Sequence, residues 1–119
     1  MKDYKEWEVW KRSMNLVEVI YDITKKFPHE EQHGLTSQMR RAAVSVPSNL
    51  AEGHARISKQ DRIHFFRIAF ASSKELETQV EISRRLGYIS EKDLAILNDL
   101  LSEVINRLVN FVFQKQKKN

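Results

Sequence analysis

Histidine and acidic side chains are the first candidates for chemistry in this sequence. The histidines fall in a polar loop (His29 and His33), at the end of one apolar helical pattern (His54) and near the start of another (His64). We interpret all four as solvated or helix-capping side chains. No metal site and no other cofactor is therefore expected.

Three glutamates, Glu75, Glu77 and Glu81, lie close together in a segment with helical periodicity. Glu77 and Glu81 share a helix face, so they form a conceivable acid–base or metal-binding pair. The interpretation that we favour is ion pairing of Glu81 with Arg84 and Arg85, three and four positions further along. Neither a Gly-rich phosphate loop nor a nucleophile elbow is present, and we do not expect an enzyme.

Basic residues are the remaining functional signal. The 119 residues include 20 Lys and Arg against 16 Asp and Glu, which gives a net charge of +4. Lys and Arg hold nucleic-acid backbones by replacing condensed counterions, so clusters gathered on one surface would bind RNA or DNA in a salt-dependent way. The predicted phosphate contacts are Lys11, Arg12, Lys25, Lys26, Arg84, Arg85, Lys115, Lys117 and Lys118.

Each basic cluster also has a structural interpretation. The pairs at 25–26 and 84–85 fall in last turns of helices, where cations suit the helix dipole. The C-terminal lysines fit a solvated tail, and a net charge of this size also serves solubility alone. Arg40 or Arg41 is expected to pair inside the bundle with Glu52, Glu75 or Glu77. Structural roles are assigned to Arg40, Arg41, Pro47, Asn49, Glu52, Gly53, Glu75 and Glu77.

The composition also indicates a compartment. The sequence has no cysteine, which excludes disulfides and thiolate metal sites and favours a reducing cytoplasm. The charged N-terminal segment lacks the apolar core of a signal peptide. No apolar run approaches the roughly 20 residues of a membrane span. We expect a cytoplasmic protein without membrane contact.

Hydrophobic periodicity divides the chain into four helical segments, at about residues 4–27, 36–56, 59–86 and 91–114. Thr36, Ser58 and Ser90 are the expected N-caps of the last three segments. Gly87 is the expected residue just beyond the end of the third. Short loops between such segments predict an all-α protein, an up-down-up-down antiparallel four-helix bundle that forms one domain over residues 1–119.

Pro47 lies inside the second segment, in the stretch GLTSQMRRAAVSVPSNLAEG at residues 34–53. Proline lacks the backbone N–H and its ring clashes with the preceding turn, at a cost of about 3 kcal/mol in a helix interior. We expect the helix to kink or break there. Asn49 or Ser45 is expected to bond the carbonyl that Pro47 leaves unpaired. Small residues around Pro47 would let neighbouring helices approach closely.

The chain resembles the four-helix-bundle protein family encoded in intervening sequences of bacterial 23S rRNA genes. The resemblance rests on LTSQMRRAAVSVPSNLAEG at 35–53, on FFRIAFASSKELETQVEISRRLGYI at 65–89, and on the opening W-x-x-W with Tyr21, Phe27 and Pro28. It implies a ring-shaped homopentamer associated with structured RNA loci, with no established catalytic residues. A similar protein of diversity-generating retroelements partners a reverse transcriptase and binds nucleic acid.

Two functions follow from these observations. The first and fourth segments each carry a second line of apolar residues, or seam, beside the one expected to face the core. These extra apolar seams independently favour a homo-oligomer. The leading hypothesis is therefore a non-catalytic homo-oligomeric module, pentameric by the resemblance, that binds RNA or other nucleic acid electrostatically. The alternative is a protein-interaction scaffold, such as an accessory subunit of a reverse transcriptase.

Overall fold

The computed structural model describes residues 3–114, which form helices joined by short connections and contain no strand. The four long helices are α1 (Glu8–Thr24), α2 (Leu35–Ala55), α3 (Lys59–Arg85) and α4 (Glu91–Val109). Three short helical turns are added: η1 (Tyr4–Glu6), η2 (His29–Glu31) and the π-helical η3 (Asn110–Gln114), which continues α4. The predicted all-α class with four helices is confirmed.

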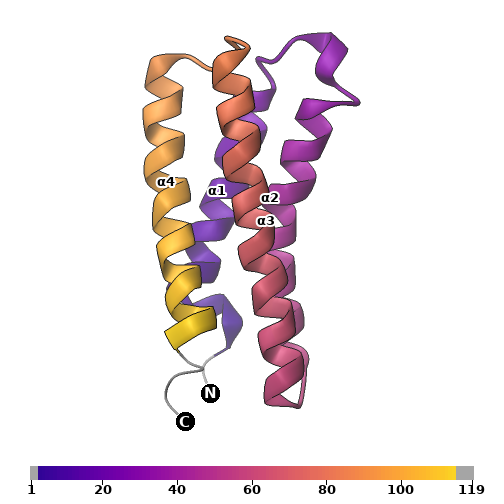
Figure 1. Cartoon of the computed structure of the whole chain (residues 1–119), viewed down its shortest axis with the longest axis vertical. Coiled ribbons are helices and arrows are strands. Elements are labelled where there is room, and N and C mark those ends of the chain that lie inside the picture. Colours follow the sequence, from indigo (N-terminus) through magenta and orange to yellow (C-terminus); the bar gives the residue numbers. More distant parts are fainter. Residues whose placement is uncertain (1–2, 115–119) are drawn as a thin grey trace.

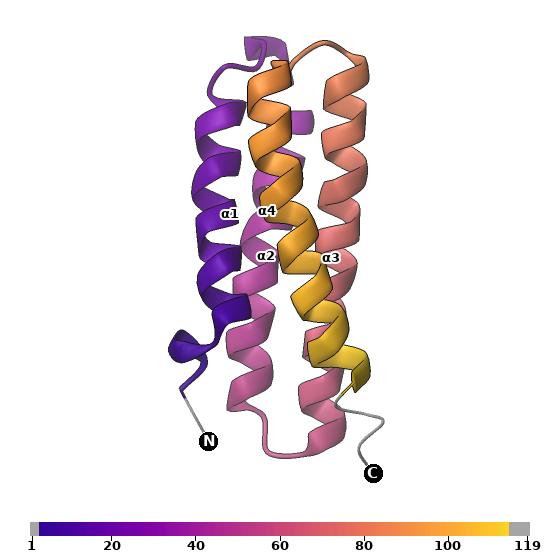
Figure 2. The ribbon, with the colours of Figure 1, turned by 90° about the vertical axis from the view of Figure 1, so that its left-hand side faces the viewer.

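The four helices lie side by side along a long axis of 46 Å (Figure 1). Each helix contacts the next one, and α4 returns to contact α1. Consecutive helices run in opposite directions, so the connections α1–α2 and α3–α4 lie at one end of the bundle (Figure 2). The turn between α2 and α3 lies at the other end, where α1 starts and η3 finishes.

Aliphatic side chains from all four helices fill the space between them. The largest fully buried ones are Leu16, Ile20, Met39, Val46, Leu50, Leu76, Leu97, Val104, Leu108 and Val112. Each contributes about 1.5–3 kcal/mol when it leaves water. This core is continuous through the bundle, and it holds both ends of the helices in place.

The contact between α2 and α3 is close because small residues line it. Ala42, Ala43 and Ala69 are fully buried, and Ser45 Oγ lies 2.8 Å from Ser72 Oγ. Such side chains keep little bulk between the two backbones. The sequence-based expectation of close helix approach therefore applies to this pair of helices.

Gly53 extends the close approach to the last turn of α2. A Cβ atom at this position would lie 2.5 Å from Cε1 of the Phe66 ring and 3.1 Å from the Arg62 carbonyl oxygen. Any side chain there would force the Phe66 ring to move and would press on the Arg62 carbonyl. Glycine at 53 therefore sets the position of the Phe66 ring beside the α2–α3 turn.

Serine side chains cap α3 and α4, as the sequence predicts. Ser58 Oγ accepts a hydrogen bond of 3.1 Å from the Asp61 backbone N–H. Ser90 Oγ accepts one of the same length from the Asp93 N–H. Both bonds satisfy N–H groups that have no partner within their own helix.

Gly87 follows the end of α3 with φ at +76°, a conformation that favours glycine. Its N–H donates to the Arg84 carbonyl at 3.0 Å, and the Tyr88 N–H donates to the Ser83 carbonyl at 2.9 Å. This pair of bonds is a Schellman motif. The prediction for Gly87 is confirmed.

The first helix is shorter than the predicted span of 4–27. Trp7 is extended (φ −70°, ψ 129°) and separates η1 from α1, so α1 begins at Glu8. At the other end α1 stops at Thr24, before Phe27 and Pro28. The extended residue turns the Trp7 side chain away from a regular helical position.

The start of α2 also differs from the prediction. Gly34 is the N-cap residue and Thr36 is buried in the first turn, so the assignment of Thr36 as the cap is wrong. The Glu31 carboxylate supplies the missing acceptor: its Oε1 accepts from the Leu35 N–H at 3.1 Å. Its Oε2 accepts from the Tyr88 hydroxyl at 3.0 Å. Glu31 thus connects the α1–α2 loop to the α3–α4 turn.

Pro47 is buried within α2, which continues through it without interruption. The predicted break is therefore wrong, and a kink stays a prediction. Asn49 Nδ2 donates to the carbonyl and to Oγ of Ser45, at 2.8 and 2.9 Å. Both amide N–H groups are used there, so Asn49 does not reach the Ala43 carbonyl that Pro47 leaves without a helical donor.

None of the helices among residues 3–114 combines the length and apolar character needed to cross a membrane.

Candidate nucleic-acid interface

Every predicted phosphate contact among the described residues forms an ion pair with a nearby acid. The pairs are Lys11–Glu8 (4.0 Å), Arg12–Glu8 (3.4 Å), Arg12–Glu103 (3.2 Å), Lys25–Asp22 (3.8 Å), Lys26–Asp93 (2.9 Å), Arg84–Glu81 (2.8 Å) and Arg85–Glu81 (2.9 Å). Exposed pairs contribute at most about 1 kcal/mol, so each cation can still exchange its acid for a phosphate. The acids nevertheless offset the positive field at these positions. Lys115, Lys117 and Lys118 lie outside the described residues.

Glu81 holds two of these arginines at once. Arg84 donates from Nε and Nη2 at 2.9 and 2.8 Å, and Arg85 donates from Nε at 2.9 Å. Hydrogen bonds from Arg84 first and Arg85 second lower the pKa of Glu81 to about 2. Glu77 instead pairs with Lys74 at 2.7 Å. The two carboxylates thus have separate partners, in line with the ion-pair interpretation.

The paired arginines at the start of α2 have different surroundings. Arg41 Nη2 lies 3.1 Å from Glu75 Oε2, but both side chains are largely exposed, so the pair is on the surface and not inside the bundle. Arg40 binds no acid among residues 3–114: its Nε donates to Thr24 Oγ1 at 2.9 Å, and its guanidinium lies 4.5 Å from the centre of the Tyr21 ring. Arg40 thus joins α2 to the end of α1.

Glu52 does not pair with either of these arginines. Its Oε2 lies 2.6 Å from Nη2 of Arg56, one helical turn along the chain. The guanidinium of Arg56 also lies over the Phe65 ring, 4.6 Å from its centre. This contact ties the last turn of α2 to the first turns of α3.

Positive charge is concentrated at the end of the bundle where α2 meets α3. Residues 54–67, which we call the basic turn, contain four basic residues and a single acid, Asp61. Within residues 3–114, Lys59 and Arg67 have no ion-pair partner, and both are exposed. Arg62 donates from Nε to the Arg56 carbonyl at 2.7 Å, which ties its guanidinium to the α2–α3 connection. His54 and His64 lie in the same segment.

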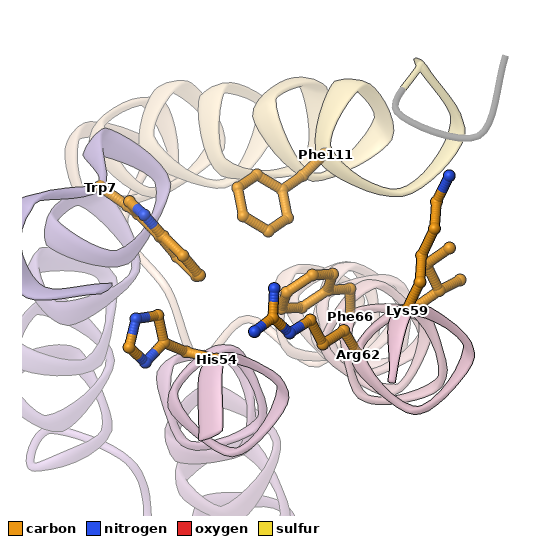
Figure 3. Close-up of a pocket in the computed structure, with 7 residues that line it drawn as sticks. Trp7, His54, Lys59, Arg62, Phe66 and Phe111 are labelled. Atoms are coloured by element: carbon orange, nitrogen blue, oxygen red, sulfur yellow. The ribbon is translucent and has the colours of Figure 1, made fainter. Parts of the chain in front are cut away.

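An aromatic pocket opens beside the basic turn (Figure 3). Its cavity of about 130 Å³ is lined by Trp7, His54, Lys59, Arg62, Ile63, Phe66 and Phe111. Ring centres are 4.6 Å apart for Phe66 and Phe111, 4.8 Å for Trp7 and Phe111, and 5.4 Å for Trp7 and His54. Four elements therefore contribute to one site, which combines aromatic walls with two cations.

The sequence-based prediction missed this site. The predicted first segment, 4–27, places Trp7 inside a helix, whereas its backbone is extended before α1 and its ring lines the pocket. Lys59, Arg62 and Arg67 were not singled out because they are isolated along the sequence and not adjacent pairs. The density of basic residues in 54–67 is the signal that would have found them.

Residues 29–33 read His-Glu-Glu-Gln-His and match the H-E-x-x-H spacing of zinc proteases, which the prediction of no metal site did not take into account. That motif binds zinc when an α-helix places both imidazoles on one face. Here only His29–Glu31 is helical, as a single 3-10 turn, so no continuous α-helix runs from His29 to His33. Among the described residues no group of three or more His, Cys, Asp or Glu is placed to hold a metal ion.

An apolar groove runs along the outside of α1 and α2, and we call it the α1–α2 groove. It is lined by Tyr4, Trp10, Met14, Val17, Val44, Pro47, Ser48 and Ala51. Met14 and Val44 are 40% and 39% exposed, whereas the neighbouring seam of α1, which includes Leu16 and Ile20, is buried. The bundle therefore covers the second apolar seam of α1 only in part: Trp10 and Val17 pack against the core, and Met14 stays exposed.

The fold and these surfaces define a four-helix-bundle protein with a basic, aromatic end. Residues 5–110 match the family described as 23S rRNA-intervening sequence protein. The chain belongs to this family, as the resemblance of its sequence motifs indicates.

A solved structure shows the same fold. The chain is similar to a protein with unknown function from the S23 ribosomal protein family of Bacteroides thetaiotaomicron, at 21% sequence identity and a TM-score of 0.79. The alignment covers 88% of this chain and 98% of that one. No curated protein matches the chain.

Proposed function

We propose that this protein is a non-catalytic, homo-oligomeric module of the cytoplasm that binds RNA or another nucleic acid. The basic turn is the observation that supports this function best. Within residues 3–114, two of its four cations, Lys59 and Arg67, have no ion-pair partner, and Lys59 lines the pocket of partly buried rings, whereas adjacent basic pairs such as Arg84 and Arg85 are bound by acids. Phosphate backbones are attracted to such uncompensated charge, and their bases stack on rings.

Self-association is the second part of the proposal. The α1–α2 groove leaves Met14 and Val44 exposed among other apolar side chains, and contiguous apolar surface of this kind supports an interface. A second copy is the occupant that we propose, because the family resemblance implies a ring of five. Repeating the basic turn around an oligomer would multiply the phosphate contacts.

A salt titration of binding to a structured RNA tests the nucleic-acid part. We expect measurable affinity at low salt and a linear fall of log K with log salt concentration. Replacing Arg67 by Glu should weaken binding and lower the magnitude of that slope by about 1, because one phosphate contact is lost.

Lys92→Glu is the matched control, since Lys92 is exposed and lies in the first turn of α4, which starts at the end opposite the α2–α3 turn. It should leave the salt slope nearly unchanged. Equal weakening by both variants would remove the basic turn as the interface, and absence of binding at low salt would reject the nucleic-acid function.

A protein partner for the α1–α2 groove is the alternative function. The groove is apolar and would equally suit a helix of another protein, such as a reverse transcriptase. A pull-down that retains a protein partner after nuclease treatment, from a protein that is monomeric when pure, would favour this scaffold role over self-association.

A further inference from the structure

We infer that the aromatic pocket holds one unstacked pyrimidine base of a single-stranded segment, while Lys59 and Arg62 contact its phosphates. This inference rests on the proposed nucleic-acid function and specifies the ligand at that same end of the bundle. It concerns the pocket lined by Trp7, His54, Phe66 and Phe111 together with these two cations.

The rings are fixed in place before any ligand arrives. Phe66 is buried against Gly53, and its ring packs edge-to-face on Phe111 at an interplanar angle of 76°. Trp7 packs on Phe111 on one side and on His54 on the other. Figure 3 shows these rings around a common space, with the Arg62 guanidinium at its edge. A base that enters therefore finds walls that need no reordering, which favours binding.

The size of the cavity favours a single ring. It measures about 130 Å³, and an apolar protein cavity of about 150 Å³ is known to hold one benzene molecule. The six-membered ring of a pyrimidine fits this space, with its sugar at the open side. A purine would leave one of its two rings outside the walls.

The charges around the pocket favour an anionic ligand. Lys59 and Arg62 lie on the first turn of α3, and none of the described residues that line the pocket is acidic. In the view of Figure 3, Lys59 extends past Phe66 and away from the space between the rings. Its ammonium group is therefore placed for a phosphate next to the bound base and not for the base itself.

Short oligonucleotides test this inference. Oligouridylate should bind the full-length protein about 5- to 150-fold more tightly than an abasic ribose-phosphate strand of equal length, because each stacked base strengthens binding by that factor. Trp7→Leu and Phe111→Leu should reduce this ratio at least several-fold while leaving affinity for the abasic strand unchanged. Phe113→Leu is the matched control, since Phe113 is on the same helical turn but outside the pocket.

Fluorescence gives a readout that a purely structural role would not change. In a Trp10→Phe background Trp7 is the one remaining tryptophan, and oligouridylate should quench its emission whereas the abasic strand should not. Adding one uracil to the abasic strand should raise its affinity for the protein more than adding one adenine does.

The possible outcomes separate the two proposals. Equal affinity of the protein for oligouridylate and the abasic strand overturns the base pocket but leaves electrostatic binding intact. A preference for uridylate that survives Trp7→Leu also overturns the base pocket. If one uracil and one adenine restore the affinity of the abasic strand equally, the assignment of a single-ring base is overturned. Absence of binding to any strand at low salt rejects the proposed function itself.

Discussion

Glu81 shows how single residues control the charge of this surface. Its carboxylate accepts hydrogen bonds from Arg84 and Arg85, so two cations of the same turn share one anion. The pKa of Glu81 falls from 4.5 to about 2 as a result. A lowered pKa in the folded state stabilises the protein above the ordinary value, and this contribution is lost as the pH falls from about 4.5 to about 2.

We therefore predict that the Glu81 carboxyl titrates near pH 2, as measured by carbon-13 NMR. In the double variant Arg84→Gln and Arg85→Gln its pKa should rise toward 4.5. Urea unfolding should show a larger loss of stability between pH 5 and pH 2 for the wild type than for Glu81→Gln. An unchanged Glu81 titration in the double variant would contradict the assigned cause.

The contact of α2 with α3 is the feature that matters most among the elements. Gly53 and Phe66 meet where no Cβ fits, and the same ring forms part of the aromatic pocket. The spacing of two helices and the shape of a binding surface therefore depend on one glycine.

Gly53→Ala should lower the free energy of unfolding by about 1–3 kcal/mol, because the added methyl group overpacks this contact. Urea denaturation measures this loss. Phe66→Leu removes the ring that the methyl group would strike, so the cost of Gly53→Ala should shrink in that background. An equal cost in both backgrounds would show that the Phe66 ring is not the obstacle.

The helices themselves were largely predictable from sequence. Their core periodicity and local signals, such as Ser58 before α3 and Gly87 after it, depend on residues that are close together in the sequence, so they can be read from it directly. The start of α2 was not predictable in this way. Its acceptor is Glu31, which also depends on Tyr88 from a distant turn.

The candidate site was less predictable than the helices. Trp7, His54 and Phe111 are far apart in the sequence, and they meet because the start of α1, the end of α2 and η3 lie at one end of the bundle. Adjacent basic pairs were a misleading guide, because acids one turn away bind most of them. Helical spacing alone does not reveal which cations remain without such an acid.

On the scale of the whole molecule, the α1–α2 groove is the surface through which we expect copies of the chain to associate. Val44 on α2 is 39% exposed within the groove, and Ile82 on α3 is 43% exposed outside it. The two side chains are similar in size and exposure. They therefore form a matched pair for locating the interface between copies.

We predict that Val44→Glu converts the oligomer to monomers in sedimentation velocity, because a buried unpaired charge strongly opposes association. Ile82→Glu should leave the oligomer intact. Circular dichroism checks that both variants stay helical. A wild-type protein that sediments as a monomer would contradict the assembly, and dissociation by Ile82→Glu alone would move the interface to α3.

The two ends of the 46 Å bundle differ, and this polarity has a consequence for a ring. Rotation about an axis parallel to the helices never inverts a subunit, so every basic turn would face the same rim and the opposite rim would carry the Glu31–Tyr88 contacts. One flexible strand could then visit several equivalent pockets in succession. Its release would require all of them to empty together, so the lifetime of the complex would grow with strand length far more steeply than the affinity of any single pocket.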